Sequence, residues 1–109
     1  MLTLKELSQK LKEGVQFSPS DLSKIRLELS GHLGLIAEEL TAILEQKPGQ
    51  WLELRKQSQS SSEADKKWEA SELGIQEMKL RWDIKVVDKI SSSLRLRLEV
   101  MDKEARNLY

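Results

Sequence analysis

The residue types that most often carry out chemistry are scarce in this sequence. His32 is the only histidine and cysteine is absent, so the chain offers no paired imidazoles or thiolates for a metal and no nucleophile with its base. The adjacent Glu38 and Glu39 indicate a solvated helix face, and Gly31 and Gly34 fall inside a predicted helix rather than in a phosphate-binding loop. We therefore expect no enzyme activity, no metal or other cofactor and no small-molecule substrate.

Binding of a macromolecule is the class of function that the side chains leave open. Three tryptophans could stack on bases while basic side chains follow a strand's phosphates. The basic residues concentrate between positions 79 and 97, and the candidate contacts to nucleic acid or a partner are Arg81, Lys85, Lys89, Arg95 and Arg97. The alternative is that this basic segment is a solvated helix face and that Trp68 and Trp82, fourteen residues apart, are helix-packing residues.

The overall composition favours helices and argues against binding by bulk charge. Basic and acidic side chains number 18 each, so the formal net charge is zero, whereas phosphate binding normally needs a basic excess. A charged fraction of 33% with only two prolines and five glycines is typical of helical proteins. No apolar run reaches the roughly 20 residues that span a bilayer, and the N-terminus lacks the apolar core of a signal peptide. We expect no membrane association and a reducing, cytoplasmic compartment.

Capping signals predict the first two helices. Thr3 and Glu6 have the spacing of a capping box, and a short helix over residues 4–13 should follow. Ser18 and Pro19 suit the N-cap and first position of a middle helix. That helix should run over 19–46, because Lys47-Pro48-Gly49 is a strong stop signal. Gly31 and Gly34 in its middle indicate a close helix crossing or a local bend.

The second half of the chain is predicted to hold one long helix. Trp51 opens a short turn or helix over residues 51–57, a flexible Ser/Gln linker covers 58–62, and Ser62 caps the start of the helix over 63–107. From Leu73 onward an apolar residue recurs at every seventh position, which predicts a helix lying along other helices. A β-hairpin over residues 82–100 is the rival interpretation, and we reject it because its turn lacks Gly, Pro and Asn and no third strand exists.

Two apolar rows run along this long helix. The first, the predicted hairpin core, is Leu73, Leu80, Ile84, Val87, Leu94, Leu98, Met101 and Leu108. The second, the predicted oligomer or partner seam, is Trp68, Ile75, Trp82, Val86, Leu96 and Val100.

A helix that is apolar on two sides needs more than one neighbour. We therefore predict a single all-α domain in which the middle and long helices form an antiparallel helical hairpin that self-associates into a homo-oligomer. In the alternative, the chain is a monomer in which the helix over 4–13 and the Trp51 segment cover the second row.

The C-terminal half resembles small helical proteins encoded by bacteriophages. The similarity lies in Trp68–Gly74, in Met78–Trp82, in Lys89-Ile-Ser-Ser-Ser-Leu-Arg95 and in Glu104-Ala-Arg-Asn-Leu-Tyr109. Some of these proteins are distantly similar to phage recombination mediators, which are helical oligomers that load a recombinase on single-stranded DNA.

The resemblance implies a non-enzymatic accessory protein of phage DNA recombination or replication, acting in the cytoplasm of an infected bacterial host. It would contact single-stranded DNA or a DNA-bound phage protein. The alternatives are a phage inhibitor that blocks a host defence complex of the CRISPR type, and a small structural protein of the virion.

Overall fold

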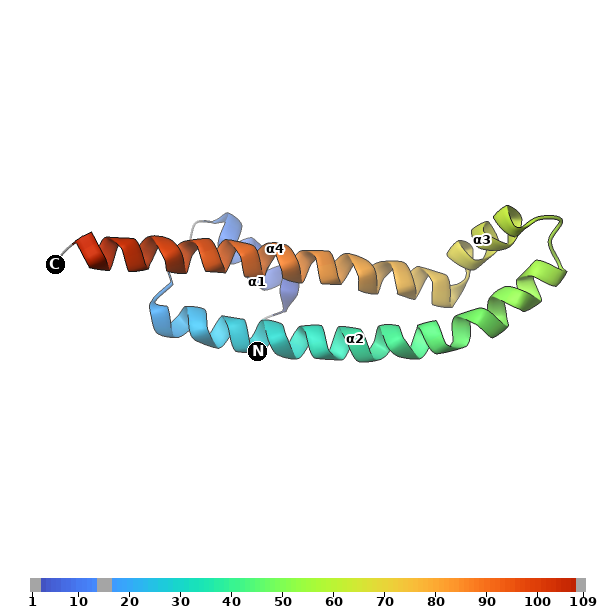
Figure 1. The fold of residues 1–109 in the computed structure, drawn as a ribbon, viewed down its shortest axis with the longest axis horizontal. Helices are drawn as coiled ribbons and strands as arrows, with labels where there is room; N and C mark the ends of the chain where they lie inside the picture. Colours follow the sequence, from blue (N-terminus) through green and yellow to red (C-terminus); the bar gives the residue numbers. More distant parts are fainter. Residues whose placement is uncertain (1–2, 14–16, 108–109) are drawn as a thin grey trace. The chain divides into compact units, whose positions relative to one another are not determined.

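The chain is all-α in the computed structural model, which describes residues 3–13 and 17–107. Four helices follow one another: α1 (Leu4–Lys12), α2 (Pro19–Lys56), α3 (Ser61–Ala70) and α4 (Glu72–Asn107) (Figure 1). No strand occurs among the described residues, and the segment considered for a β-hairpin lies inside α4. The predicted all-α fold class is confirmed.

The first two helices begin where the capping signals predict. The backbone N–H of Glu6 donates to the Thr3 hydroxyl at 3.1 Å, and that of Asp21 donates to the Ser18 hydroxyl at 3.1 Å. Asp21 completes a reciprocal pair, because its carboxylate accepts from the Ser18 N–H at 3.3 Å. Local side-chain chemistry therefore determines both starts.

The predicted end of the middle helix at residue 46 is wrong. Helix α2 continues through Pro48 to Lys56 and includes residues 51–56 of the segment that we assigned to a separate turn over 51–57. A proline in a helix interior costs about 3 kcal/mol, so packing must stabilise the continuation. Beyond the proline, the Trp51 indole N–H donates to Asp65 of α3 at 2.8 Å, and Leu54 is half-buried.

The polar connector is shorter than predicted. Helix α3 begins at Ser61, because Ser60 rather than Ser62 is its N-cap and accepts from the Glu63 N–H at 3.1 Å. The preceding residues are also hydrogen-bonded, since Ser58 donates to the Leu54 carbonyl at 2.7 Å and the Gln59 N–H donates to Glu63 at 2.9 Å. The linker predicted over 58–62 is therefore two separate features, a capped turn and the first residues of α3.

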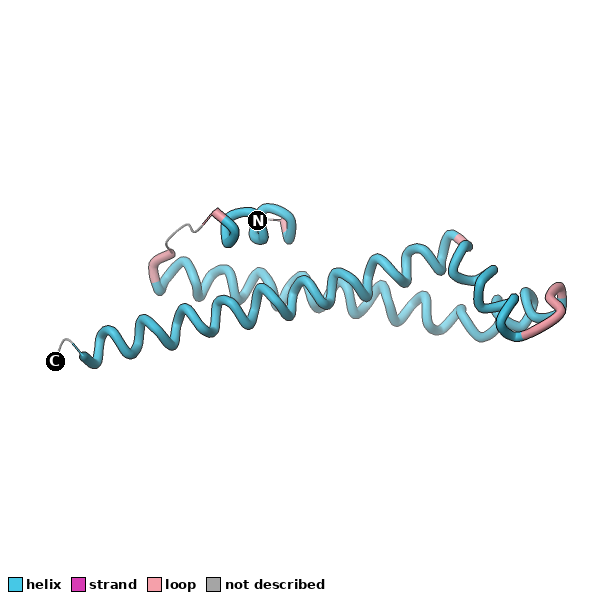
Figure 2. The backbone as a smooth tube through the Cα atoms, turned by 90° about the horizontal axis from the view of Figure 1, so that it is seen from above, coloured by secondary structure: helices cyan, strands magenta, loops and turns pink. Residues whose placement is uncertain are grey.

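The long helix predicted over 63–107 is interrupted at Ser71, between α3 and α4. Figure 2 shows the interruption as a short loop between two helices. Ser71 has an extended backbone with φ −73° and ψ 161°. Its N–H and its hydroxyl both donate to the Trp68 carbonyl, which ends α3. The same hydroxyl accepts from the Gly74 N–H at 3.1 Å and so caps α4. One serine therefore ends one helix and starts the next.

Contacts group the chain into two compact units. Unit 1 comprises Met1–Gly34 and Ile84–Tyr109, and unit 2 comprises Leu35–Asp83. Helices α2 and α4 each contribute a segment to both units. The expectation of one helical domain over residues 1–109 stays a prediction.

Unit 1 packs α1 against segments of α2 and α4. The buried side chains of this core are Leu7 from α1, Leu22, Ile25 and Leu29 from α2, and Val87, Ile90 and Leu94 from α4. Arg97 of α4 donates to the carbonyl of Leu11 at 3.4 Å and lies 5.6 Å from the centre of the Phe17 ring. Helix α1 is therefore held by one buried leucine and by an arginine of α4.

Unit 2 packs α3 against the remaining segments of α2 and α4. Its buried apolar side chains are Ile36, Leu40 and Ile43 from α2 and Ala64 and Trp68 from α3. Trp68 is only 4% exposed, and the acidic residue Glu77 of α4 is buried beside it at 8%. At Gly34, which belongs to unit 1, an added Cβ would meet no atom within 4 Å, so the first of the two predicted alternatives, a close helix crossing, does not occur at this residue.

The break at Ser71 requires a glycine at position 74. A Cβ on Gly74 would lie 1.8 Å from the carbonyl oxygen of Trp68, whereas one on Gly49, in the same unit, would meet nothing within 4 Å. We predict that Gly74→Ala lowers the free energy of unfolding by about 1–3 kcal/mol, the typical cost of steric overpacking. Gly49→Ala should raise it by about 1 kcal/mol because alanine favours a helix interior.

Urea titration followed by circular dichroism measures both effects. Equal effects of the two substitutions would contradict the close approach of Gly74 to the Trp68 carbonyl.

Candidate functional site

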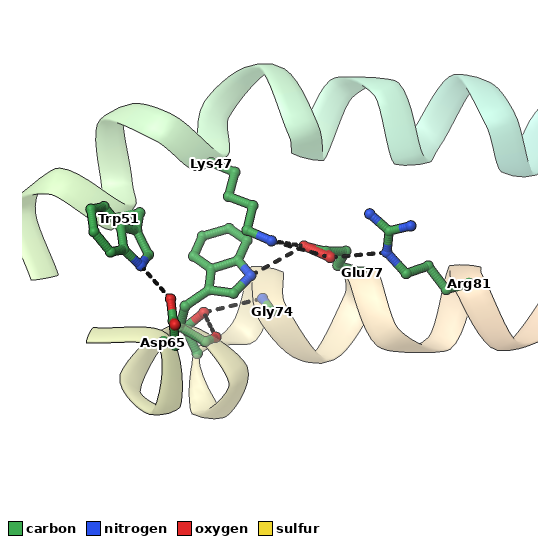
Figure 3. Close-up of polar contacts among 8 residues, drawn as sticks. Lys47, Trp51, Asp65, Gly74, Glu77 and Arg81 are labelled. Atoms are coloured by element: carbon green, nitrogen blue, oxygen red, sulfur yellow. Dashed lines mark hydrogen bonds and ion pairs between the residues drawn. The ribbon is translucent and has the colours of Figure 1, made fainter. Parts of the chain in front are cut away.

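Unit 2 contains a buried carboxylate that binds side chains from three helices. Glu77 Oε1 accepts from Lys47 Nζ of α2 at 2.8 Å and from the Trp68 indole N–H of α3 at 3.2 Å. Glu77 Oε2 accepts from Arg81 Nε, one turn along α4, at 3.1 Å. Figure 3 shows Lys47 and Arg81 reaching Glu77 from opposite sides. We call Lys47, Trp68, Glu77 and Arg81 the Glu77 cluster.

The cluster balances the cost of burying a charge. Burial raises the pKa of Glu77, but the hydrogen bonds from Lys47, Arg81 and Trp68 together outweigh it, so the pKa of Glu77 lies below its ordinary value of 4.5. Lys47 Nζ also lies 5.5 Å from the centre of the Trp68 ring, a cation–π contact. Glu77 is therefore ionised at neutral pH.

The geometry indicates that Glu77 has a structural role rather than a role in proton transfer. Both carboxylate oxygens already accept hydrogen bonds from cationic or indole donors, and a lowered pKa works against proton donation near pH 7. Glu77 instead fixes the positions of α2, α3 and α4 within unit 2. Sequence reasoning missed this residue, although Glu77 and Arg81 have the four-residue spacing of a helical ion pair.

Beside this cluster, α4 carries apolar side chains on its solvent-facing side. Ile75 is 39% exposed, Met78 65% and Trp82 63%. Their spacing of three and four residues places them on one side of the helix. We call Ile75, Met78 and Trp82 the α4 stripe. Met78 was not among the predicted seam residues, although it lies three positions after Ile75.

The structure distributes the predicted seam residues unevenly. Ile75, Trp82, Leu96 and Val100 are exposed on α4, and Val86 is half-buried. Trp68 lies on α3 and belongs to the core of unit 2. Its assignment to a row along α4 depended on an uninterrupted helix, and the break at Ser71 removes it from that row.

The predicted hairpin-core residues are mostly shielded from solvent. Val87 and Leu94 are buried, Leu108 lies outside the described residues, and the half-buried members are Leu73, Leu80, Ile84, Leu98 and Met101. Ile90 is also buried and was not predicted, although it follows Val87 by three positions and precedes Leu94 by four.

Several of the predicted basic contacts already bind parts of the chain. Arg81 pairs with Glu77, Arg97 contacts Leu11 and Phe17 of unit 1, and Lys85 also has an interaction partner. Lys89 and Arg95 are exposed. The five residues therefore do not form a uniform set of cations presented to a phosphate backbone.

Unit 2 also has an open groove between α2 and α4. Its volume is about 460 Å³. Ile43 and Leu80 are among its apolar lining residues, while Lys79 and Asp83 contribute opposite charges. The mixed lining does not favour one ligand chemistry.

Other kinds of site were sought in the described part of the chain. Residues 3–13 and 17–107 contain no group of three or more His, Asp or Glu side chains that could hold a metal ion. None of the described helices is long and apolar enough to cross a membrane. No family model matches the sequence, and neither curated proteins nor solved structures gave a match.

The lowered pKa of Glu77 predicts an acid-sensitive contribution to stability. Because the folded pKa lies below 4.5, ionised Glu77 stabilises the fold fully above that pH, and the stabilisation is lost as the pH falls through the folded pKa. Glu77→Gln should lower the free energy of unfolding at pH 7 by about 1–3 kcal/mol. It should also flatten the dependence of this free energy on pH below 4.5.

Urea titrations at pH 3.5, 4.5 and 7 measure the free energy of unfolding of Glu77→Gln and of the wild-type chain. Glu45→Gln is the control, because Glu45 is exposed on α2 in the same unit. If Glu77→Gln and Glu45→Gln have the same pH dependence, the Glu77 cluster does not stabilise the fold in the way described.

Proposed function

We propose that this chain is a non-enzymatic interaction protein that binds a helix of another protein through the α4 stripe. The observation that carries the proposal is the exposure of Met78 and Trp82, at 65% and 63%, on one side of a helix. Large apolar side chains that cluster on a surface are typical of interaction sites, and an amphipathic helix is a common form of recognition surface.

The partner that the stripe fits best is a second copy of the same chain. Ile75 and Trp82 are seven residues apart, which is the repeat of helices that pack along one another. Two copies of α4 related by a twofold axis would place identical stripes together. A homo-oligomer of this kind would cover Trp82 without another protein.

The proposal extends to an antiparallel helical hairpin as the unit that associates. Its support is that α2 and α4 each run without interruption through residues of both units. Within each unit the buried leucines and isoleucines of α2 are three or four residues apart, as in a helix that packs along a neighbour: Leu22, Ile25 and Leu29 in unit 1, and Ile36, Leu40 and Ile43 in unit 2.

We further propose that the protein acts as an accessory factor in phage DNA recombination or replication, in the cytoplasm of an infected bacterium. This setting rests on the resemblance of the C-terminal half to phage proteins. A DNA-bound protein is the better candidate contact than single-stranded DNA for the basic segment of α4, because Arg81 and Arg97 already bind other parts of the chain and the net charge is zero.

The two alternative functions predict different partners. An inhibitor of a host defence complex would purify with a single bacterial nuclease complex from a lysate. A virion component would be found in purified phage particles at a fixed copy number. Loading of a recombinase on single-stranded DNA in the presence of this protein would favour the accessory function over both.

Substitution of the α4 stripe tests self-association. Met78→Lys and Trp82→Lys place a charge in the proposed interface, so each should weaken association by at least about tenfold, since 1.4 kcal/mol corresponds to a factor of ten. Sedimentation equilibrium over a range of concentrations measures the effect. Leu52→Lys is the matched control, because Leu52 is 55% exposed on α2 of the same unit.

A wild-type chain that remains monomeric at high concentration would remove the proposed homo-oligomer. Equal weakening by Leu52→Lys would show that the α4 stripe is not the interface.

A further inference from the structure

Unit 1 contains a pocket that takes no part in the self-association proposed above, although one of its lining residues, Arg95, belongs to the basic segment of α4. Its volume is about 290 Å³. Two residues on its walls are arginines, two are serines and two are apolar: Arg26, Leu29, Ser30, Val87, Ser91 and Arg95. Leu29 and Val87 are buried, so the pocket has an apolar floor below polar side chains.

The polar residues have a matching arrangement on the two helices. Arg26 and Ser30 lie one turn apart on α2, and Ser91 and Arg95 lie one turn apart on α4. The segments of α2 and α4 in unit 1 run in opposite directions (Figure 1). On α2 the arginine precedes the serine, and on α4 the serine precedes the arginine. Because the two segments are antiparallel, both arginines lie toward the same end of the pocket.

Neither arginine has a counter-charge among the described residues. None of the ion pairs found among the described residues, such as Lys47 with Glu77, involves Arg26 or Arg95. Glu99 lies one turn beyond Arg95 on α4 but forms no ion pair with it. Two guanidinium groups on one pocket repel each other, and an anion between them would relieve that repulsion.

We propose that this pocket binds a phosphate group. Each guanidinium is a planar fork that donates two parallel hydrogen bonds to an oxyanion, and the Ser30 and Ser91 hydroxyls add two further donors. A tetrahedral phosphate has acceptors in several directions and can receive from both helices. A planar carboxylate has two oxygens in one plane and a single negative charge, so it matches this donor set less well.

The size of the pocket limits the ligand. Sites for small molecules typically begin at roughly 300 Å³, so this pocket accommodates a phosphate with little attached to it. The phosphate belongs either to a small phosphate ester or to the backbone of a nucleic acid that passes across the pocket mouth. The site lies in unit 1 and is independent of the α4 stripe in unit 2, so either proposal can fail without the other.

Inorganic phosphate is the probe for the site. Broadening of its ³¹P NMR signal by the full chain measures binding, and we expect Arg26→Gln and Arg95→Gln each to weaken it at least about tenfold. Lys24→Gln on α2 and Lys103→Gln on α4 remove the same charge outside the pocket and should leave the broadening unchanged. Arg95→Lys should bind at an intermediate level, because it keeps the charge and loses the fork.

Arg26 and Arg95 are both exposed, so we expect their substitution to leave the helices intact. Circular dichroism of each variant checks this. Fluorescence anisotropy of a labelled single-stranded oligonucleotide then distinguishes the source of the phosphate. The site is assigned to a nucleic-acid backbone if the chain binds the oligonucleotide, if inorganic phosphate displaces it and if Arg26→Gln abolishes this binding. Phosphate binding without oligonucleotide binding assigns it to a small phosphate ester.

Three results would overturn the proposal. The first is the absence of phosphate broadening by the wild-type chain. The second is broadening by Arg26→Gln or Arg95→Gln that equals the broadening by the wild-type chain, and the third is displacement of phosphate by acetate at equal concentration.

Discussion

The arrangement of unit 2 depends on the break at Ser71. The hydroxyl of Ser71 donates to the Trp68 carbonyl and accepts from the Gly74 N–H, so α3 ends and α4 begins on the same side chain. The Trp68 carbonyl lies too close to the position of a Cβ on residue 74 for any side chain to fit, so only glycine permits this approach. The break lets Trp68 pack into the core instead of extending the apolar row of α4. Ile75, Met78 and Trp82 consequently form a separate exposed surface.

The buried charge of Glu77 makes this arrangement specific. A carboxylate that is 8% exposed is stable only when its hydrogen-bonding capacity is filled. The donors here come from α2, α3 and α4. Any shift of one helix would leave the charge partly unpaired, whereas an apolar core tolerates small displacements. The cluster therefore determines the register of the helices, which is the best-supported use of a buried polar group.

Features of the fold that depend on local side-chain chemistry could be predicted from the sequence. Features that depend on packing between residues far apart in the sequence could not. The caps at Thr3 and Ser18 act within one turn, and the periodicity of α2 and α4 follows from burial on one side. Pro48 is a stop signal by its own chemistry, but contacts of Trp51 with α3 continue the helix beyond it. Ser71 interrupts a repeat that is otherwise regular. Once that break is missed, Trp68 is placed on the wrong helix and the Glu77 cluster cannot be found.

Hydrogen exchange at the Trp68 indole N–H tests the central claim most directly. In this structure that N–H is buried and donates to Glu77 Oε1 at 3.2 Å, whereas an uninterrupted helix over 63–107 would place Trp68 in the exposed row. NMR of ¹⁵N-labelled indoles resolves the three tryptophans. We predict that the Trp68 indole N–H exchanges much more slowly than a free indole and that Gly74→Ala accelerates the exchange. Exchange of wild-type Trp68 at the rate of a free indole would contradict the account.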